Sequence, residues 1–316
     1  MDLPGDDGAS LDKPYKLILD TKVPSGVIKE LESAEILLAD GHLLGQILYA
    51  LPNLKWAQTT YAGVERIMKG FFPEKGKPTF TVTRFSGDHF GKQMSEYVLA
   101  QVVNFERKFF LCHQNQSQGK WIADGNIKYY RLIKDMTCGV MGVGKIGMEI
   151  CRTLHHFGGR VKGLGRCPKL DLGCEATILS DYKTVKELDN FLSDLDLLVC
   201  VLPNTPETCG LLNNGMLKNC KNQPLFVNIG RGSLILEEEI LKALNERWIR
   251  GAILDVFNEE PLPSNHPLWS HQQVVVTPHV SGITRLQEVV TVFSSQLQKF
   301  SDGQPLDNVL DWDAGY

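Results

Sequence analysis

The sequence Cys-Gly-Val-Met-Gly-Val-Gly-Lys-Ile-Gly at positions 138–147 decides the fold of this chain. An apolar, strand-like run leads into its glycines, and a helix-like run at 148–154 leaves them. A strand, a GxGxxG turn and a helix in this order form the dinucleotide-binding fingerprint. The glycines allow a tight turn, a close approach to a pyrophosphate and close packing of helix on strand, while N–H groups at the helix start bind phosphate. The expected cofactor contacts are Gly142, Gly144, Lys145, Ile146 and Gly147.

Short apolar runs alternate with helix-like segments on both sides of the fingerprint. This alternation predicts an α/β protein with parallel sheets covered on both faces. Helix-like spacing covers residues 43–51 and 93–110, and the second of these bridges two sets of strands. The expected strands are 16–19, 36–39, 56–59 and 80–83 in the first set, and 139–141, 160–164, 197–201, 225–229, 252–254 and 274–276 in the second. The six strands of the second set match a doubly wound dinucleotide-binding sheet.

Length and composition favour an ordinary globular protein with two domains. The chain has 316 residues, 43% of them hydrophobic and 22% charged. A net charge of −4 gives no electrostatic reason to expect a nucleic acid or an anionic membrane as partner. The eight cysteines are scattered without metal-like spacing, and no apolar run approaches the roughly 20 residues that cross a bilayer. We therefore expect a cytoplasmic protein with no bound metal.

Polar residues that follow three predicted strands are the candidate catalytic groups. Arg231 follows the strand at 225–229, Asp255 and Glu260 follow the strand at 252–254, and His279 follows the strand at 274–276. The carboxyl ends of parallel strands meet at one edge, so these side chains converge on one crevice. A guanidinium, a carboxylate and an imidazole together can bind an anion and move a proton. Each residue alone fits a structural role as well, and Glu259 competes with Glu260 on chemistry.

The ordered motifs GVGKIG, LPNTPET, NIGRG, LDVFNEEPLP and TPHVSG resemble the D-isomer-specific 2-hydroxyacid dehydrogenase family, which includes glyoxylate and hydroxypyruvate reductases. The resemblance extends to residues 54–64, 94–98 and 308–316. It implies an oxidoreductase that reduces glyoxylate, hydroxypyruvate or a bulkier 2-ketoacid to the D-2-hydroxyacid with a nicotinamide cofactor. It also implies a homodimer, with residues 102–111 and Trp121 as candidate contacts.

The resemblance assigns roles to the candidate residues. His279 is the general acid, Glu260, directly before Pro-Leu, keeps the imidazole protonated, and Arg231 binds the substrate carboxylate and carbonyl oxygen. Backbone N–H groups of Ala62, Gly63 and Val64 hold the carboxylate from the other end. Asp255 accepts from the nicotinamide carboxamide, and Pro203, Asn204, Thr205 and Thr208 line the ribose and phosphate side. Arg84 and Arg285 are further cationic candidates, and Trp269 either closes over substrate or packs locally.

The second strand of the nucleotide-binding set predicts the cofactor. NAD-selective sheets carry an acidic residue about 20 positions after the glycines. Here Gly165 stands where the family's NAD-using members have that acid, and Arg166 follows it. An arginine binds a 2′-phosphate with two donors, so we predict NADP(H) rather than NAD(H), with Lys169 as a weaker contact. The alternative is that Arg166 and Lys169 are solvated loop charges.

The expected architecture is two doubly wound parallel-sheet domains, a Rossmann nucleotide-binding domain and a flavodoxin-like substrate domain. Residues 1–14 are expected to form a tail, 15–107 with 285–316 the substrate-binding domain, and 108–284 the dinucleotide-binding domain. The rival from another functional class is a nucleotide-sensing, corepressor-like scaffold on the same fold. Oxidation of formate or phosphonate is a less favoured rival among oxidoreductases.

Overall fold

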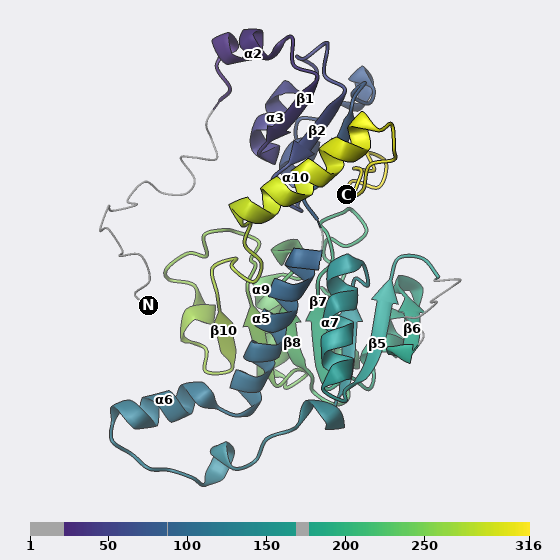
Figure 1. Ribbon diagram of the computed structural model, residues 1–316. Helices are drawn as coiled ribbons and strands as arrows, with labels where there is room; N and C mark the ends of the chain where they lie inside the picture. Colours follow the sequence, from purple (N-terminus) through teal and green to yellow (C-terminus); the bar gives the residue numbers. More distant parts are fainter. Residues whose placement is uncertain (1–21, 87, 169–176) are drawn as a thin grey trace. The chain divides into compact units, whose positions relative to one another are not determined.

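The computed structural model describes residues 22–86, 88–168 and 177–316, arranged in two compact units (Figure 1). One unit contains the described residues up to Phe85 together with Thr284–Tyr316, and the other contains those from Ser86 to Ile283. Each holds a parallel sheet with helices, so the α/β class predicted from the sequence is confirmed. The tail expected at 1–14 and the strand expected at 16–19 lie outside the described residues.

The first unit is built on a three-stranded parallel sheet in the order β1-β2-β3. Its central strand is buried along its whole length, and its core includes Leu44, Ile67 and Val82. The strands are β1 (Ile36–Ala39), β2 (Trp56–Thr59) and β3 (Thr81–Thr83). The helices are α2 (Ser25–Leu31), α3 (Gly41–Ile47), α4 (Glu65–Met68), α10 (Leu286–Ser301) and the short 3-10 turn η1 (Pro73–Lys75).

The C-terminal stretch completes this unit. The ring of Trp56 on β2 stacks on Phe293 and Phe300 of α10, with centroids 5.2 and 5.5 Å away. Farther along, Val309 bridges to Thr83, and the N–H of Leu310 donates to the carbonyl of Val82 at 2.8 Å. The unit is therefore assembled from two stretches of chain that are far apart in sequence.

The second unit contains a seven-stranded, all-parallel sheet in the order β10-β9-β8-β7-β4-β5-β6. The strand order reverses between β4 and β7, which is the switch point of a doubly wound sheet. The strands are β4 (Thr137–Met141), β5 (Arg160–Gly165), β6 (Leu179–Thr184), β7 (Leu197–Cys200), β8 (Leu225–Asn228), β9 (Gly251–Leu254) and β10 (Val274–Val276).

Six of these seven strands match the sequence prediction, and β6 does not. The sequence Leu-Ser-Asp-Tyr-Lys-Thr of β6 is mostly polar, and only its first residue is buried. An edge strand with one partner needs little apolar surface, so its sequence carries no strand-like apolar run. The prediction of six strands was therefore wrong by one.

Helices cover both faces of the larger sheet. Those of this unit are α5 (Asp88–Glu106), α6 (Phe109–Ser117), α7 (Lys145–His156), α8 (Leu188–Leu192) and α9 (Glu237–Asn245). Its 3-10 turns are η2 (Gly125–Ile127), η3 (Ile133–Asp135), η5 (Val185–Glu187), η6 (Met216–Asn219), η7 (Gly232–Leu234) and η8 (Pro267–Ser270). No helix in the described part of the chain has the length and apolar character to cross a bilayer.

The structure has two helices where the sequence predicts one helix at 93–110. This span is divided into α5 and α6 at Lys108, whose left-handed φ of 56° ends the first helix. Helix α5 packs along α7, beside it in Figure 1. The boundary between the units therefore falls at Ser86, not at the expected 107, because α5 belongs to the core of the second unit.

Candidate active site

Three loops at the carboxyl edge of the larger sheet carry the candidate catalytic side chains. Arg231 directly precedes η7 after β8, Asp255 directly follows β9, and His279 stands three residues after β10. Because β8, β9 and β10 are adjacent and parallel, the chain leaves all three at the same edge. The sheet thus brings loops from 230, 255 and 279 into one neighbourhood.

His279 and Glu260 form the central pair. Nδ1 of His279 lies 2.8 Å from Oε2 of Glu260, and Oε1 of that carboxylate accepts the N–H of Phe257 at 2.9 Å. Both side chains remain accessible, with 47% and 37% of their surface exposed. The structure therefore places Glu260, not Glu259, on the imidazole. With Nδ1 engaged, Nε2 is the ring nitrogen left for a substrate.

The pair shifts both pKa values in the direction that favours an ion pair. The hydrogen bond to Glu260 raises the pKa of His279, against the opposing effect of burial, and the carboxylate charge adds to the rise. Burial opposes ionisation of Glu260, but hydrogen bonds from His279 and the Phe257 N–H outweigh it and lower the pKa of Glu260. The imidazole of His279 therefore keeps its proton to higher pH than an ordinary histidine does.

Arg231 is positioned by its own turn. Its Nη1 donates to the carbonyl of Gly230 at 2.7 Å, and its carbonyl accepts from Nδ2 of the buried Asn228 at 3.0 Å. The guanidinium is close enough for its charge to act on both His279 and Glu260. The guanidinium, carboxylate and imidazole thus share one site. Asn228, a polar residue that ends an apolar strand, supports this turn and was not foreseen as functional.

The backbone of His279 is held in an uncommon conformation. Its φ of 56° is left-handed, and its N–H donates to the carbonyl of Asp255 at 2.9 Å. The Asp255 carboxylate accepts from the N–H groups of Val280 and Ser281, each at 2.9 Å, and from the hydroxyl of Thr277. These bonds fix the loop that presents the imidazole, at a conformational cost typical of active sites.

Asp255, which is expected to contact the cofactor carboxamide, is enclosed by the loop that carries His279. The residue is 0% exposed, and the hydrogen bonds of its carboxylate go to the 277–281 loop. The Thr277 hydroxyl gives its proton to Asp255, so Tyr97 is the donor in the 2.7 Å contact between the Tyr97 and Thr277 hydroxyls. Burial raises the pKa of Tyr97 to about 12, which keeps it a donor. Neither Tyr97 nor Thr277 was assigned a role from sequence.

The glycine turn fits a dinucleotide pyrophosphate. Gly142 has a φ of 101°, and a Cβ at Gly147 would stand 2.0 Å from the Gly142 carbonyl, so the helix requires glycine to approach the strand. A Cβ at Gly144 would meet nothing within 4 Å, which leaves open space beside the start of α7. Helix α7 begins with Lys145 and Ile146, and no side chain caps its N-terminus. The fit supports a bound phosphate group at this turn.

The loop after β7 is held by hydrogen bonds of its own side chains. The hydroxyl of Thr208 donates to the carbonyl of Pro203 at 2.6 Å and accepts the N–H of Thr205 at 2.9 Å. Asn204 Oδ1 accepts from the hydroxyl of Ser233 at 2.8 Å, which ties this loop to the one that carries Arg231. The side chain of Thr208 therefore serves the loop itself in this structure.

The end of β5 carries the residues expected to select the cofactor. Gly165 ends the strand, Arg166 follows it exposed, and its charge acts on Glu207 in the loop after β7. Lys169 lies outside the described residues. The cationic Arg166 is thus presented at the carboxyl edge of the sheet.

The expected substrate loop lies in the first unit, between β2 and α4. Val64 is buried at the start of α4, and the carbonyl of Tyr61 accepts the N–H of Phe85 at 3.2 Å. Within the described chain, no residue accepts a hydrogen bond from the N–H groups of Ala62, Gly63 or Val64. This loop therefore offers three donors in sequence.

Trp269 and Arg84, also considered from sequence, make local contacts. Trp269 is half-exposed, and its Nε1 donates to the carbonyl of Pro263 at 2.9 Å. Burial lowers the pKa of Arg84, which lies over the ring of Tyr316, and Arg285 is exposed at the start of α10. Among residues 22–86, 88–168 and 177–316, no cluster of His, Cys, Asp and Glu could hold a metal.

The sequence matches a family model and a curated relative. Residues 99–281 match the family model described as "D-isomer specific 2-hydroxyacid dehydrogenase, NAD binding domain". The chain is 33% identical over 257 residues to glyoxylate/hydroxypyruvate reductase A of Escherichia fergusonii. The aligned residues make up 81% of this chain and 80% of the relative.

Solved structures are similar over nearly the whole chain. A D-isomer specific 2-hydroxyacid dehydrogenase family protein of Aeromonas salmonicida has a TM-score of 0.79 at 32% identity, over 92% of this chain and 89% of its own. The NADPH-dependent glyoxylate/hydroxypyruvate reductase of Sinorhizobium meliloti, solved with NADP and sulfate, has a TM-score of 0.76 at 28% identity, over 90% and 88%.

Proposed function

This chain belongs to the D-isomer specific 2-hydroxyacid dehydrogenase family, an enzyme family, and from that premise we propose that it reduces a 2-ketoacid to the D-2-hydroxyacid with NADPH. The observation that carries the proposal is the 2.8 Å contact between His279 and Glu260 with Arg231 beside it. Glyoxylate and hydroxypyruvate are the first substrates to test, since the relatives from E. fergusonii and S. meliloti are named for them.

The residues of the chain divide the work of the reduction. Arg231 binds the substrate carboxylate and the carbonyl oxygen, which places the ketone at Nε2 of His279. Glu260 keeps the imidazole protonated, and His279 gives that proton to the carbonyl oxygen. A bound reduced nicotinamide would supply the hydride that adds to the carbonyl carbon. The ketone thereby gains one hydride and one proton and becomes the alcohol.

The N–H groups of Ala62, Gly63 and Val64 are proposed to bind the substrate carboxylate as well. Three successive donors without an acceptor in the described structure suit an anion, since carboxylates accept several hydrogen bonds. Pro203, Asn204 and Thr208 are proposed to line the cofactor through the backbone and shape of their loop. The role of Asp255 in this proposal is to hold the His279 loop.

NADPH is proposed over NADH because of the residues that end β5. Gly165 leaves no carboxylate to bind the ribose hydroxyls or repel a 2′-phosphate, and Arg166 supplies a cation next to it. The relative from S. meliloti, solved with NADP, supports this choice. Replacement of Arg166 by alanine is expected to raise the KM for NADPH more than the KM for NADH.

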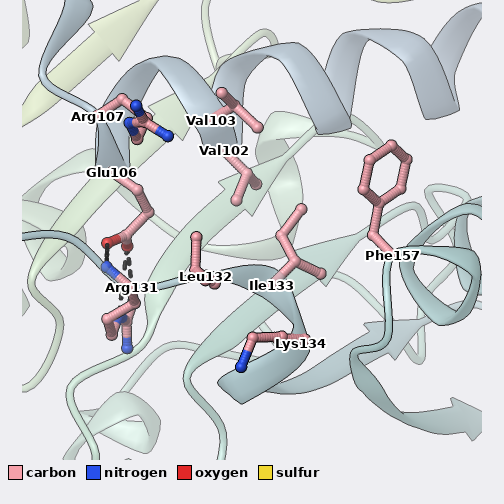
Figure 2. A pocket seen from close by; sticks show the side chains of 9 residues that line it. All are labelled: Val102, Val103, Glu106, Arg107, Arg131, Leu132, Ile133, Lys134 and Phe157. Atoms are coloured by element: carbon pink, nitrogen blue, oxygen red, sulfur yellow. Dashed lines mark hydrogen bonds and ion pairs between the residues drawn. The ribbon is translucent and has the colours of Figure 1, made fainter.

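A homodimer is also proposed, through the surface at the end of α5 and along α6. Trp121 is 97% exposed, and residues 109–111 are all exposed and apolar, whereas Val102 is buried in the monomer. Figure 2 shows the residues that line a neighbouring pocket, among them Glu106 paired with Arg131. The pocket has a volume of about 250 Å³, and Nη2 of Arg131 lies 2.8 Å from Oε1 of Glu106. So many exposed apolar side chains on one segment suit a protein interface.

The cytoplasmic setting expected from the cysteines also stays a proposal. Those that the structure describes are all free thiols, which suits a reducing compartment. Fractionation of cells that express the chain, with detection of the protein in each fraction, tests it.

Steady-state assays with a panel of 2-ketoacids of increasing size, each with NADPH and with NADH, test the proposed reaction. We expect consumption of NADPH with at least one ketoacid, at a higher kcat/KM than with NADH. Binding of NADPH without turnover of any ketoacid would contradict the proposal and favour a nucleotide-sensing scaffold.

A further inference from the structure

Tyr182 stands against the glycines that end β5. It lies on the neighbouring strand β6, where it pairs in register with Gly163. A Cβ built on Gly163 would lie 3.1 Å from Cδ2 of the Tyr182 ring. A Cβ built on Gly165 would lie 2.0 Å from the Tyr182 hydroxyl oxygen and 3.0 Å from Cζ. The phenol therefore fills the space that a side chain at position 165 would need.

The Tyr182 hydroxyl is not a loose side-chain end that can swing away without cost. It donates to the carbonyl of Cys167 at 3.0 Å. Burial, and then the neighbouring Cys167, raise the pKa of Tyr182, so the hydroxyl stays a donor. The ring is packed over Gly163 at one end and bonded to the 165–168 turn at the other.

We propose that Tyr182 is a specificity-determining residue for the cofactor: it keeps position 165 a glycine and fixes the turn that presents Arg166. This inference rests on the proposed preference for NADPH and adds its structural cause. An acidic residue that binds the ribose hydroxyls of NAD needs a Cβ at position 165. That Cβ is incompatible with the Tyr182 hydroxyl in its present place.

The proposal makes the two positions act as a pair. An aspartate at position 165 forces Tyr182 out and breaks its bond to Cys167, so it disturbs the turn that carries Arg166 instead of creating an NAD site. With phenylalanine at position 182, the atom at 2.0 Å is gone and the nearest remaining ring atom is at 3.0 Å. A shift of a few tenths of an ångström then admits the new side chain.

Thermal unfolding of the cofactor-free protein tests the packing directly. We would compare the wild type, Gly165→Ala, Tyr182→Phe and the double variant. Gly165→Ala is expected to lower Tm by about 2–10 °C in the wild type and by much less in the Tyr182→Phe background. Gly26→Ala is the control, because a Cβ at Gly26 meets nothing within 4 Å. Equal falls in Tm for Gly165→Ala in both backgrounds would overturn the inference.

Equilibrium binding of NADPH and of NADH then tests specificity. Gly165→Asp alone is expected to weaken binding of both, whereas Gly165→Asp with Tyr182→Phe is expected to bind NADH at least about tenfold more tightly than Gly165→Asp alone. Equal gains in NADH binding with and without Tyr182→Phe would refute the role of Tyr182. The wild-type ratio of the two Kd values tests the proposed NADPH preference separately, so the two failures are distinguishable.

Discussion

In the proposed reaction, the hydrogen bond between His279 and Glu260 sets the pH range over which a ketone is reduced. The proposal makes the acid form of His279 the reactive one, and the pKa of His279 is raised chiefly by the hydrogen bond to Glu260. We therefore expect the rate of reduction to be retained at pH values above the ordinary pKa of histidine. The rate should fall only as the pH rises through the raised pKa of His279, because the imidazole then loses its proton.

Replacement of Glu260 by glutamine tests this coupling. The amide keeps the shape but removes the negative charge, so the pKa of His279 should fall. The high-pH limb of kcat/KM for reduction should then move to lower pH, as a pH–rate profile would measure. Glu259→Gln is the matched control, since Glu260 and not its neighbour contacts the imidazole, and it should leave the limb in place. A limb that Glu260→Gln leaves in place would contradict the pairing.

The hydroxyl of Thr277 is expected to matter through the loop that it holds. Thr277→Val removes the donor to Asp255 and the acceptor for Tyr97, so the left-handed His279 loses part of its support. We expect kcat to fall about tenfold with little change in the Kd of NADPH, and Thr277→Ser to restore it. Steady-state kinetics measures the change in kcat, and equilibrium binding measures the Kd of NADPH. Equal kcat values for the valine and serine variants would exclude this role.

Sequence could name the residue types of the site but not their contacts. Arg231, Glu260 and His279 follow three strands of one parallel sheet, and that topology alone predicts that they meet. The choice of Glu260 over Glu259 depended on the family pattern, because both carboxylates are one residue from each other on the same loop. The enclosure of Asp255 could not be foreseen, since it follows from a loop that turns back through a left-handed histidine.

At the level of elements, Gly232 allows the loops after β8 and β9 to come into contact. A Cβ at Gly232 would stand 1.9 Å from the backbone carbon of Phe257, and the Phe257 N–H in turn binds Glu260. The turn that carries Arg231 therefore lies in backbone contact with the loop that carries Glu260. Any side chain at position 232 must separate the guanidinium from the carboxylate.

Gly232→Ala should therefore reduce both stability and activity. Overpacking of this kind costs about 1–3 kcal/mol, so the Tm of the second unit should fall by about 2–10 °C. Gly26→Ala, which adds a methyl group in open space on helix α2, should leave Tm unchanged or slightly raised. Calorimetry of the three proteins measures the difference. Equal Tm values for Gly232→Ala and wild type would show that the two loops are not in close contact.

Elements with apolar runs were predictable, and those without such runs were not. The buried strands β4, β7, β8 and β9 read as apolar segments because both faces of their sheet are covered. The polar edge strand β6 has no such signal. The end of α5 was not predicted, because the apolar spacing of residues 93–110 is helical throughout. Nothing in that spacing indicates the left-handed conformation of Lys108.

At the level of the whole molecule, the alternation of strands and helices was enough to predict two parallel sheets. The return of the C-terminal stretch to the first unit depends on contacts between residues far apart in sequence, such as Trp56 with Phe293 and Phe300. Periodicity within a segment says nothing about such partners. The family resemblance supplied that part of the prediction.

The association state is a prediction at the same scale. We expect the wild type to sediment as a dimer, because Trp121 and residues 109–111 leave a large apolar surface uncovered. Phe110→Glu with Trp121→Glu should shift the protein to monomer, while Leu286→Glu, an exposed apolar residue outside this segment, should not. Analytical ultracentrifugation measures all three. A monomeric wild type at micromolar concentration would contradict the proposed dimer.

The most direct test of the account is the rate of ketoacid reduction by His279→Gln, measured beside the Kd of NADPH. Glutamine cannot serve as a general acid, but it leaves the glycine turn and the loop after β7 unchanged. We predict that kcat/KM with the best ketoacid falls by about 10²- to 10⁴-fold while the Kd of NADPH stays within about twofold. A variant that reduces the ketoacid as fast as the wild type would contradict the claim that this imidazole supplies the proton.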